Sequence, residues 1–569
     1  MHALTHPPSL AQPVAPDAIA SAVVNAAGQA APIDLLSLVF DTLQALVAHD
    51  SASDERSTTI PSTPGQRKLG AWIADTMRSF GAAVEIDAHG NVLGALPGSG
   101  AGAKAPPIAM MAHLDTARGT VATPALRRVA GWRGDRVPYT DNAAMQVDIA
   151  TYPSLAAFCG QTLVHGEGRA PFGLDDKLGL TEILTLGAWL AAEGGDRPPL
   201  LLIARPDEEI GCMAAVEGLS EALRDRGVRL GWTIDGIAPF EINVENFDAA
   251  MVRVSLPEAT MTAAATMGAA ADVPLRTGLR LSIGGVNTHG ATAKAEGHRP
   301  ATRLAAELLG ALDAAGLGPE FVAPCAFGSD SERDCDGVLD LGVAASAPAD
   351  AEARVAACAE AIIAPHRPRG ASLGLLSFEG GGGWRMSHAV TAALRLVRDV
   401  LADPTVLPVA AEDSDGRQGY SQPFRILPID GGVRLDVRLR DFDPALLDQR
   451  AATVAARCPA GAGFERVDQY INMGPQLRGV SALIEWPEAA ARRLGLPTVV
   501  QPIRGGTGVD PFLSRGVAIG NLGTGYFAPE SEKELTSLEM AAAHVRWLAA
   551  LIAIAATAGA EASPRVAQP

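Results

Sequence analysis

Five short stretches of the chain end apolar, strand-like runs and are rich in acidic residues or histidine. An isolated acid at a strand end is usually a solvated loop residue. Several such ends together supply the oxygen and imidazole ligands that a pair of divalent cations needs, with one carboxylate shared between the ions. The sequence therefore predicts a dinuclear metal site. The stretches are Met111-Ala112-His113-Leu114-Asp115-Thr116, Gly173-Leu174-Asp175-Asp176-Lys177, Pro206-Asp207-Glu208-Glu209-Ile210-Gly211, Thr233-Ile234-Asp235-Gly236 and Glu530-Ser531-Glu532-Lys533-Glu534.

The spacing within two of these stretches suggests separate tasks for neighbouring side chains. His113 and Asp115 are two residues apart at a strand end, so their side chains project to the same side. His113 can then bind a metal while Asp115 holds its other ring nitrogen. Asp175 and Asp176 are adjacent just before a predicted helix, so one carboxylate can bridge two ions while the other turns away.

Glu208 and Glu209 are adjacent on a predicted loop. One of them can ligate a metal, and the other can act as a general base beside a metal-activated water. Each acidic pair alone is weak evidence, but their order along an α/β chain strengthens the prediction.

Composition limits the class of protein. The chain has 569 residues, of which 48% are hydrophobic, and its formal net charge is −18. That length predicts two or three domains. The acidic balance argues against nucleic acids and anionic membranes as partners, because both require a basic face; ordinary solubility accounts for it.

The cysteines and the N-terminus indicate a cytoplasmic protein. The six cysteines show no C-x-x-C spacing, which is typical of reduced thiols. Residues 1–35 lack the basic and apolar regions of a signal peptide and are expected to form a flexible leader. No apolar run reaches membrane-spanning length, and 547–556 is expected to be only part of a terminal helix.

Apolar strands alternate with amphipathic helices over residues 36–245. This alternation predicts the first part of an α/β catalytic domain with a mostly parallel sheet, in which ligands bind at the carboxyl ends of the strands. Helices are expected at 35–49 and, after an N-cap at Ser62 or Thr63, to Phe80. Further strands are expected at 107–111, 199–204 and 231–234, and further helices at 177–193 and 213–226.

The pattern changes near residue 246. An inserted α+β lid domain is expected over 246–469, and the catalytic domain is expected to resume over 470–569. Residues 318–412 look like an additional insertion. Within them, 338–378 echoes the strand-helix-strand pattern that starts at 433, which indicates a duplicated lid unit; the alternative is a chance likeness between two alanine-rich segments.

Taken in order, these motifs resemble peptidase T, a family of tripeptide aminopeptidases, and more broadly the dinuclear zinc metallopeptidases that include aminoacylases, glutamate carboxypeptidases and dipeptidases. The resemblance covers both ends of the chain and leaves roughly 318–412 unmatched. Besides the acidic stretches, it is carried by residues 61–66, 160–163, 245–247, Thr288-His289-Gly290-Ala291-Thr292-Ala293-Lys294, Arg440-Asp441-Phe442-Asp443 and Pro502-Ile503-Arg504-Gly505-Gly506-Thr507.

The resemblance implies a set of metal ligands. Asp175 would bridge two divalent ions, and His113 with Asp235 would complete one site. Glu209 and a residue near the C-terminus would complete the other. Zinc is the expected metal, with manganese or cobalt as alternatives. The resemblance also implies a cis peptide between Asp175 and Asp176.

The same resemblance implies catalytic and substrate-binding roles. Glu208 would be the general base, Asp115 would orient the metal-binding histidine, and His289 of the lid would polarise the scissile carbonyl. Arg504 and Arg440 are candidates for binding a substrate carboxylate. The alternatives are structural ion pairs for the arginines and a surface position for His289.

Two departures from the family pattern affect the predicted site. Glu530 stands where the family carries a metal-binding histidine. An additional anionic ligand favours harder ions such as manganese, or else the second metal is weak or absent. The insertion of Gly508 and Val509 before Asp510 leaves open which end of the substrate is recognised.

These observations predict a hydrolase, specifically a metallopeptidase that cleaves an amide bond of a short peptide like a tripeptide aminopeptidase. One alternative is an amidase or deacylase acting on N-acyl amino acids. Another is a metal-impaired pseudo-enzyme that only binds such ligands. A duplicated lid unit would occupy the place of a partner's lid, which favours a monomer over a homodimer. His289 or His388 would then act within one chain. The alternative is that the insertion only enlarges the lid of a dimer.

Overall fold

The computed structural model describes residues 34–123, 125–264, 273–287, 297–329, 333–380, 384–402 and 418–558. The chain forms two compact units. Unit 1 comprises residues 1–141, 147–246 and 470–569, and unit 2 comprises 142–146 and 247–469. Nearly all of the expected leader, and His289 with its motif, lie outside the described residues.

Unit 1 is built on an eight-stranded sheet in the order β1-β2-β6-β3-β7-β18-β8-β17. The four central strands β6, β3, β7 and β18 run parallel, which confirms the predicted α/β class with a parallel core. The bounds are β1 Ala83–Ile86, β2 Val92–Leu96, β3 Ile108–His113, β6 Leu200–Arg205, β7 Leu230–Gly236, β8 Glu241–Asn243, β17 Val499–Val500 and β18 Ala518–Gly523. A small second sheet joins β4 Arg127–Val129, β5 Leu163–His165 and β19 Leu535–Ser537.

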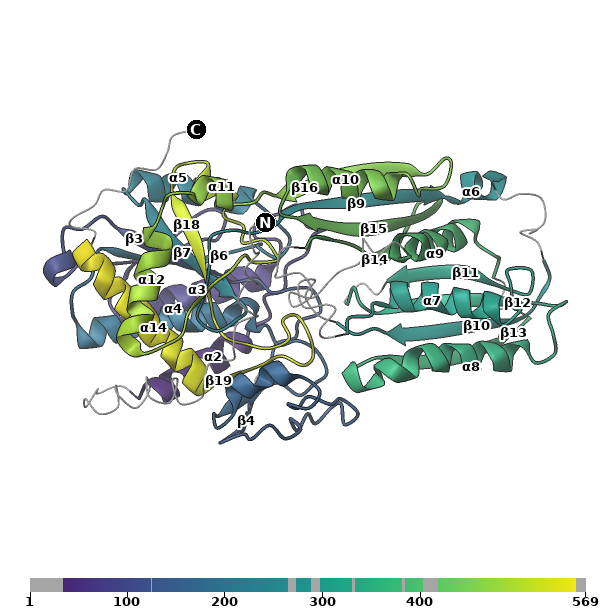
Figure 1. Ribbon diagram of the computed structural model, residues 1–569, viewed down its shortest axis with the longest axis horizontal. Coiled ribbons are helices and arrows are strands. Elements are labelled where there is room, and N and C mark those ends of the chain that lie inside the picture. Colours follow the sequence, from purple (N-terminus) through teal and green to yellow (C-terminus); the bar gives the residue numbers. More distant parts are fainter. Residues whose placement is uncertain are drawn as a thin grey trace, which may run out of the picture. The chain divides into compact units, whose positions relative to one another are not determined.

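Helices cover the central strands of unit 1. β3 and β6 are buried along their whole length, as expected for parallel strands covered on both faces. α4 packs on β3, β6 and β7, and α14 packs on α4 and α12 (Figure 1). The bounds are α2 Leu35–Val47, α3 Pro64–Ser79, α4 Leu174–Glu193, α5 Ala214–Asp225, α11 Gly474–Leu477, α12 Ala482–Leu494, α13 Asp510–Leu513 and α14 Leu538–Ala558, with 3-10 turns η1 Gly100–Gly102 and η2 Pro153–Phe158.

The C-terminal helix α14 spans Leu538–Ala558, so residues 547–556 are part of a terminal helix, as expected. The expectation that no apolar run reaches membrane-spanning length was wrong, because α14 is long and apolar enough to cross a membrane. However, 78% of its apolar window is buried inside the protein. A helix that is apolar on all sides is equally typical of a domain core, and α14 lies in the core of unit 1.

Unit 2 contains two four-stranded sheets with the same β-α-β-β-α-β order along the chain. Their strand orders, β11-β12-β10-β13 and β14-β15-β9-β16, correspond strand for strand. The first repeat consists of β10 Leu275–Gly284, α7 Ala301–Ala314, β11 Val322–Ser329, β12 Gly337–Ala344, α8 Ala351–Ile363, the 3-10 turn η3 Ala364–Arg369 and β13 Ser372–Glu379. It is inserted into the second, which consists of β9 Asp248–Pro257, the short α6 Glu258–Ala264, α9 His388–Leu401, β14 Tyr420–Ile429, β15 Gly432–Asp441, α10 Pro444–Ala455 and β16 Gly463–Tyr470.

The two repeats adjoin along β11 and β14, which lie side by side in Figure 1. The Ile426 amide donates a hydrogen bond to the Ser329 hydroxyl across this junction at 3.1 Å. Apolar side chains from both repeats form one continuous core. The edge of the second sheet at β14 is therefore covered by the first repeat.

Candidate metal centre

The parallel strands of unit 1 bring three polar side chains to one edge of the sheet. His113 ends β3, Arg205 ends β6, and Asp235 is the penultimate residue of β7. In the sheet register His113 lies opposite Arg205. Met111 lies opposite Thr233, two residues before His113 and Asp235 respectively. The three side chains therefore start at the same level, at the edge where parallel sheets bind ligands.

His113 is buried at the centre of this edge, surrounded by carboxylates. Its Nε2 lies 3.0 Å from Asp175 Oδ1 and 3.4 Å from Asp235 Oδ1. Its Nδ1 lies 2.9 Å from the main-chain oxygen of Asp115. Because a carbonyl oxygen can only accept a hydrogen bond, His113 Nδ1 must carry the proton. In the neutral ring, Nε2 then has a free lone pair, and this lone pair faces the carboxylates. Burial acts to lower the pKa of His113, but the carboxylates of Asp235, Asp115 and Asp175 raise it well above its ordinary value.

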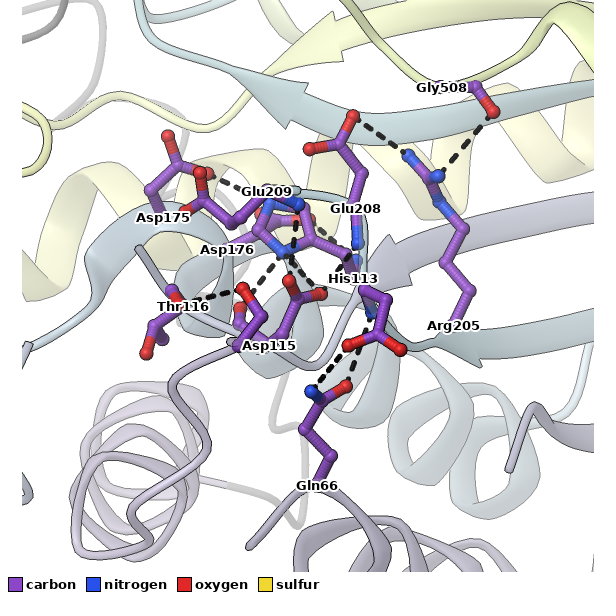
Figure 2. Close-up of polar contacts among 12 residues, drawn as sticks. Gln66, His113, Asp115, Thr116, Asp175, Asp176, Arg205, Glu208, Glu209 and Gly508 are labelled. Carbon is purple, nitrogen blue, oxygen red and sulfur yellow. Dashed lines mark hydrogen bonds and ion pairs between the residues drawn. The ribbon is translucent and has the colours of Figure 1, made fainter. Parts of the chain in front are cut away.

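Asp115 contacts His113 through two groups. Its carboxylate, which was expected to hold the histidine ring, places Oδ1 3.6 Å from Nδ1, and its main-chain oxygen lies closer, at 2.9 Å. The carboxylate also accepts hydrogen bonds from the amides of Glu208 at 2.9 Å and Glu209 at 3.1 Å. Asp115 therefore fixes the acidic turn through its side chain and His113 through its main chain (Figure 2).

Asp175 and Asp176 point to different partners. They stand at the start of α4 with non-helical backbone angles, and the peptide between them is cis, as expected. Asp176 accepts hydrogen bonds from the amides of His113 and Gly179, both at 3.1 Å. Asp175 contacts His113 through Oδ1 and accepts a hydrogen bond from the Tyr526 hydroxyl through Oδ2 at 2.9 Å. One carboxylate thus faces the site while the other supports the backbone.

The turn that carries Glu208 and Glu209 is anchored from a distant part of the chain. Asp207, at φ 55°, accepts hydrogen bonds from the Ser62 amide at 2.8 Å and from Gln66 Nε2 at 2.6 Å. The Asp207 amide donates in return to Gln66 Oε1 at 3.2 Å. Ser62, in the loop before α3, and Gln66, in the first turn of α3 (Figure 2), therefore hold the acidic turn in place.

Two overlapping groups in the described residues could each hold a metal ion. One is His113, Glu208 and Asp235, and the other is His113, Asp175 and Glu209; within each, one ligand atom per residue lies within 4.8 Å of the others. These donors are oxygen and imidazole nitrogen, which suit zinc, manganese and related ions.

The electrostatics of the cluster also fit a cation. Burial raises the pKa of Asp235 above its usual value and that of Glu208 to about 7. Burial, with the charges of Asp175 and Glu530, raises the pKa of Glu209 well above its ordinary value. Glu209 Oε1 is buried and has no hydrogen-bond partner among the described residues. Crowded, buried carboxylates of this kind are stabilised when a cation compensates their charge.

The sequence analysis missed two residues of this site. Arg205 places Nη2 3.5 Å from Glu208 Oε1 and donates to the carbonyls of Thr507 at 2.7 Å and Gly508 at 3.4 Å. An arginine at the end of the apolar run 200–204 was an available signal for it. Tyr526 lies in a loop without regular periodicity, and no sequence pattern indicated it.

Glu530 lies near the centre but outside both metal-binding groups. It has a positive φ of 56°, its amide donates to Glu534 Oε1 at 3.0 Å, and its charge contributes to the raised pKa of Glu209. Glu534 also accepts hydrogen bonds from the amides of Phe172 and Gly173, each at 2.9 Å. Glu534 therefore joins the C-terminal loop to the segment that precedes Asp175, and metal binding by Glu530 stays a prediction.

The predicted substrate-binding arginines are both buried. Arg504 belongs to unit 1. Arg440 belongs to β15 of unit 2, where it donates to the Leu439 carbonyl and to Gln469 Oε1, both at 2.9 Å. His388 begins α9, and its amide donates to Glu258 at 2.7 Å. The roles proposed for the two arginines and for His289 stay predictions.

Comparison with known proteins was made by family, by sequence and by structure. No family model matches the chain. It is 30% identical over 227 residues to peptidase T of Halothermothrix orenii, covering 39% of this chain and 54% of that protein. It is 32% identical over 209 residues to a peptidase T-like protein of Rhizobium meliloti, covering 36% and 50%. Over 474 residues it is 23% identical to peptidase T of Geobacillus thermodenitrificans, covering 80% and 84%.

A crystal structure of the aminopeptidase PepT from Bacillus cereus aligns with 92% of this chain and 99% of that one, at 13% identity and a TM-score of 0.45.

The fold and site define an α/β protein with a cluster of half-buried carboxylates and one buried histidine at the carboxyl edge of its sheet. In sequence, the chain is peptidase T-like. It spans about half the length of the first relatives that it matches.

Proposed function

We propose that this chain is a metal-dependent hydrolase that cleaves an amide bond of a short peptide, like a tripeptide aminopeptidase. The observation that carries the proposal is the convergence of His113, Asp175, Glu208, Glu209 and Asp235 at one edge of the sheet, where His113 is buried and the four carboxylates are half-buried. The sequence similarity to peptidase T supports it independently. A crowded set of half-buried, unneutralised carboxylates is costly unless it binds a cation, and this cost argues against a protein without metal chemistry.

His113, Asp175, Glu209 and Asp235 would hold two divalent ions, with Asp175 shared between them and zinc, manganese or cobalt as the metal. When bound, such ions act as Lewis acids toward water and toward the substrate carbonyl. The hydrogen bond from His113 Nδ1 to the Asp115 carbonyl fixes the ring and leaves Nε2 as the nitrogen that would bind an ion.

Glu208 is the residue proposed to move the proton. Its amide is fixed by Asp115, and its Oε1 lies near Arg205 Nη2, so the carboxylate is held in one place. It accepts a proton from the attacking water and returns it to the leaving amine, which lets one group act first as base and then as acid. His289, Arg440 and Arg504 are proposed to contact the substrate.

The remaining assignments concern the whole protein. We propose a monomer, because β11 of the first repeat covers the β14 edge of the second. We propose a cytoplasmic location, which the six free cysteines support.

A substrate panel tests the proposed reaction. The chain, loaded with zinc, manganese or cobalt, is given alanine-rich tripeptides, dipeptides and N-acetyl amino acids, and the products are identified by mass spectrometry. Release of the N-terminal residue from tripeptides is expected. Hydrolysis confined to N-acetyl amino acids would establish the amidase alternative. Metal binding without hydrolysis of any substrate would favour the pseudo-enzyme.

A further inference from the structure

Three arginines and one histidine gather at one end of the first repeat of unit 2: Arg299, Arg303, His366 and Arg369, called here the basic cluster. Burial lowers the pKa of Arg299, and the charges of Arg303 and Arg369 lower it further. Burial also lowers the pKa of His366, and all three arginines add to this effect. The four groups therefore lie close enough to repel one another.

The sheet register explains why two distant segments meet there. Arg299 forms a backbone bridge with Val286, just beyond the end of β10. Ser372, at the start of β13, pairs with Gly284 at the end of the same strand. The turn η3, which ends at Arg369, therefore reaches the strand end at which Arg299 is anchored.

Arg369 is packed closely against the backbone. Gly297 has a φ of +73°, and a Cβ added there would lie 2.5 Å from Arg369 Cδ and 2.7 Å from its Nε. Arg369 Nε and His366 Nδ1 are both buried and have no hydrogen-bond partner in the described part of the chain. These nitrogens are positioned by packing, yet their hydrogen-bonding capacity is unused.

Among the described residues, one carboxylate compensates the charge of the cluster. Glu307 acts on both Arg299 and His366, and it is already engaged by Arg303 Nε at 2.8 Å. α7 begins at Ala301 and has no acidic residue in its first turn, so its N-terminus adds positive potential. Grouping half-buried cations with unmet hydrogen bonds is unfavourable, and a bound anion would remove that cost.

We propose that the basic cluster binds a small, multiply charged oxyanion of the phosphate or dicarboxylate class. The guanidinium groups of Arg299 and Arg369 suit paired oxygen atoms, for which the planar fork is the matching donor. This site lies within unit 2 and does not depend on the proposed hydrolysis.

Arginine labelling of the full-length chain locates the site. The chain is treated with phenylglyoxal alone, with inorganic phosphate or with succinate, and the modified arginines are mapped by mass spectrometry. Arg299 and Arg369 are expected to be protected by one of the two anions. Arg367 is the internal control, because it lies on the same turn but pairs with Glu360 at 2.7 Å. Protection by phosphate alone identifies the phosphate class, and protection by succinate alone identifies the dicarboxylate class; equal labelling of all three arginines with both anions would overturn the proposal.

Calorimetric titration with the protecting anion gives the second measurement. Arg369→Gln is expected to weaken binding about tenfold or more, because it removes a charge-assisted contact. Arg367→Gln is expected to bind like the unmodified chain. If Arg369→Gln binds the anion as tightly as Arg367→Gln, the basic cluster is not the binding site.

Discussion

Asp115 illustrates how a single residue can position several others. Its two carboxylate oxygens hold the amides of Glu208 and Glu209, and its carbonyl lies 2.9 Å from the ring of His113. A proposed general base and two proposed metal ligands are thus fixed relative to one another by one buried residue. Such preorganisation is what hydrolysis requires, because the reacting groups must already be in place when the substrate binds.

Glu208→Gln tests the proposed general base. The amide keeps the shape of the side chain but cannot take a proton, so tripeptide turnover is expected to fall by about 10²- to 10⁴-fold. Metal content should be unchanged. Glu193→Gln, at the exposed end of α4, is the matched control. A Glu208→Gln enzyme that retains nearly full turnover would show that another group accepts the proton.

Tyr526→Phe tests a contact that the sequence did not reveal. The Tyr526 hydroxyl donates to Asp175 Oδ2 at 2.9 Å, and loss of an outer hydrogen bond to a metal ligand typically weakens metal binding by about 10- to 100-fold. We expect a loss of this size in competition with a metal-sensitive dye. Tyr420→Phe, in unit 2, should leave affinity unchanged. Equal affinities for the two variants would mean that Tyr526 does not position Asp175.

At the scale of single elements, periodicity predicted the central strands β3, β6 and β7 and the helices α2 to α5 of unit 1, but not the strands β1, β2 and β18. The apolar runs before His113 and Asp235 are strands β3 and β7, and the acidic stretches lie at their carboxyl ends. Capping was harder to predict. Thr63 is at the N-cap of α3, but its hydroxyl donates to the Ala52 carbonyl, while that of Ser62 donates to Asp207. Hydroxyls used in tertiary contacts cannot be distinguished from caps by local sequence.

The candidate site shows the same limit. The acidic pairs were predictable because adjacent carboxylates at strand ends are unusual, and the structure brings them together. Arg205 and Tyr526 were not predicted, since Arg205 contacts Thr507 and Tyr526 contacts Asp175, and each contact joins residues that are far apart in the chain. The main-chain contact of Asp115 with His113 was not predicted, because side-chain spacing does not reveal main-chain hydrogen bonds.

Glu352→Gln tests the ion pair between Glu352 of α8 and Arg276 of β10. Glu352 accepts hydrogen bonds from Arg276 Nε at 2.9 Å and Nη2 at 2.8 Å, and this pairing lowers its pKa from 4.5 to about 2. The ionised form therefore stabilises the folded state at pH values above 4.5, and this contribution is lost as the pH falls toward 2.

Urea unfolding at neutral pH should show that Glu352→Gln lowers the free energy of unfolding by about 1–2 kcal/mol. The difference from the unmodified chain should shrink as the solution is acidified. Glu360→Gln, which breaks an exposed ion pair with Arg367, should change stability by less than about 0.5–1 kcal/mol. A Glu352→Gln effect that is the same at neutral and acidic pH would contradict the assignment.

At the scale of the whole molecule, the repeated topology of unit 2 bears on assembly. An uncovered sheet edge can pair with a second chain, whereas a covered edge cannot. Here β11 lies against β14 within one chain. Light scattering at micromolar concentration is therefore expected to give the mass of one 58.6 kDa chain. A mass twice that value would show that the first repeat does not replace a partner.

The central claim is that the buried edge of unit 1 is a dinuclear metal site with Asp175 shared between the ions. Metal content per chain, measured after saturation with zinc or manganese and removal of free metal, tests it most directly. The unmodified chain should hold two ions, and Asp175→Ala should hold fewer than one. The control is Asp225→Asn, which changes an exposed residue of α5 and should also hold two ions. Two ions retained by Asp175→Ala, or none bound by the unmodified chain, would contradict the account.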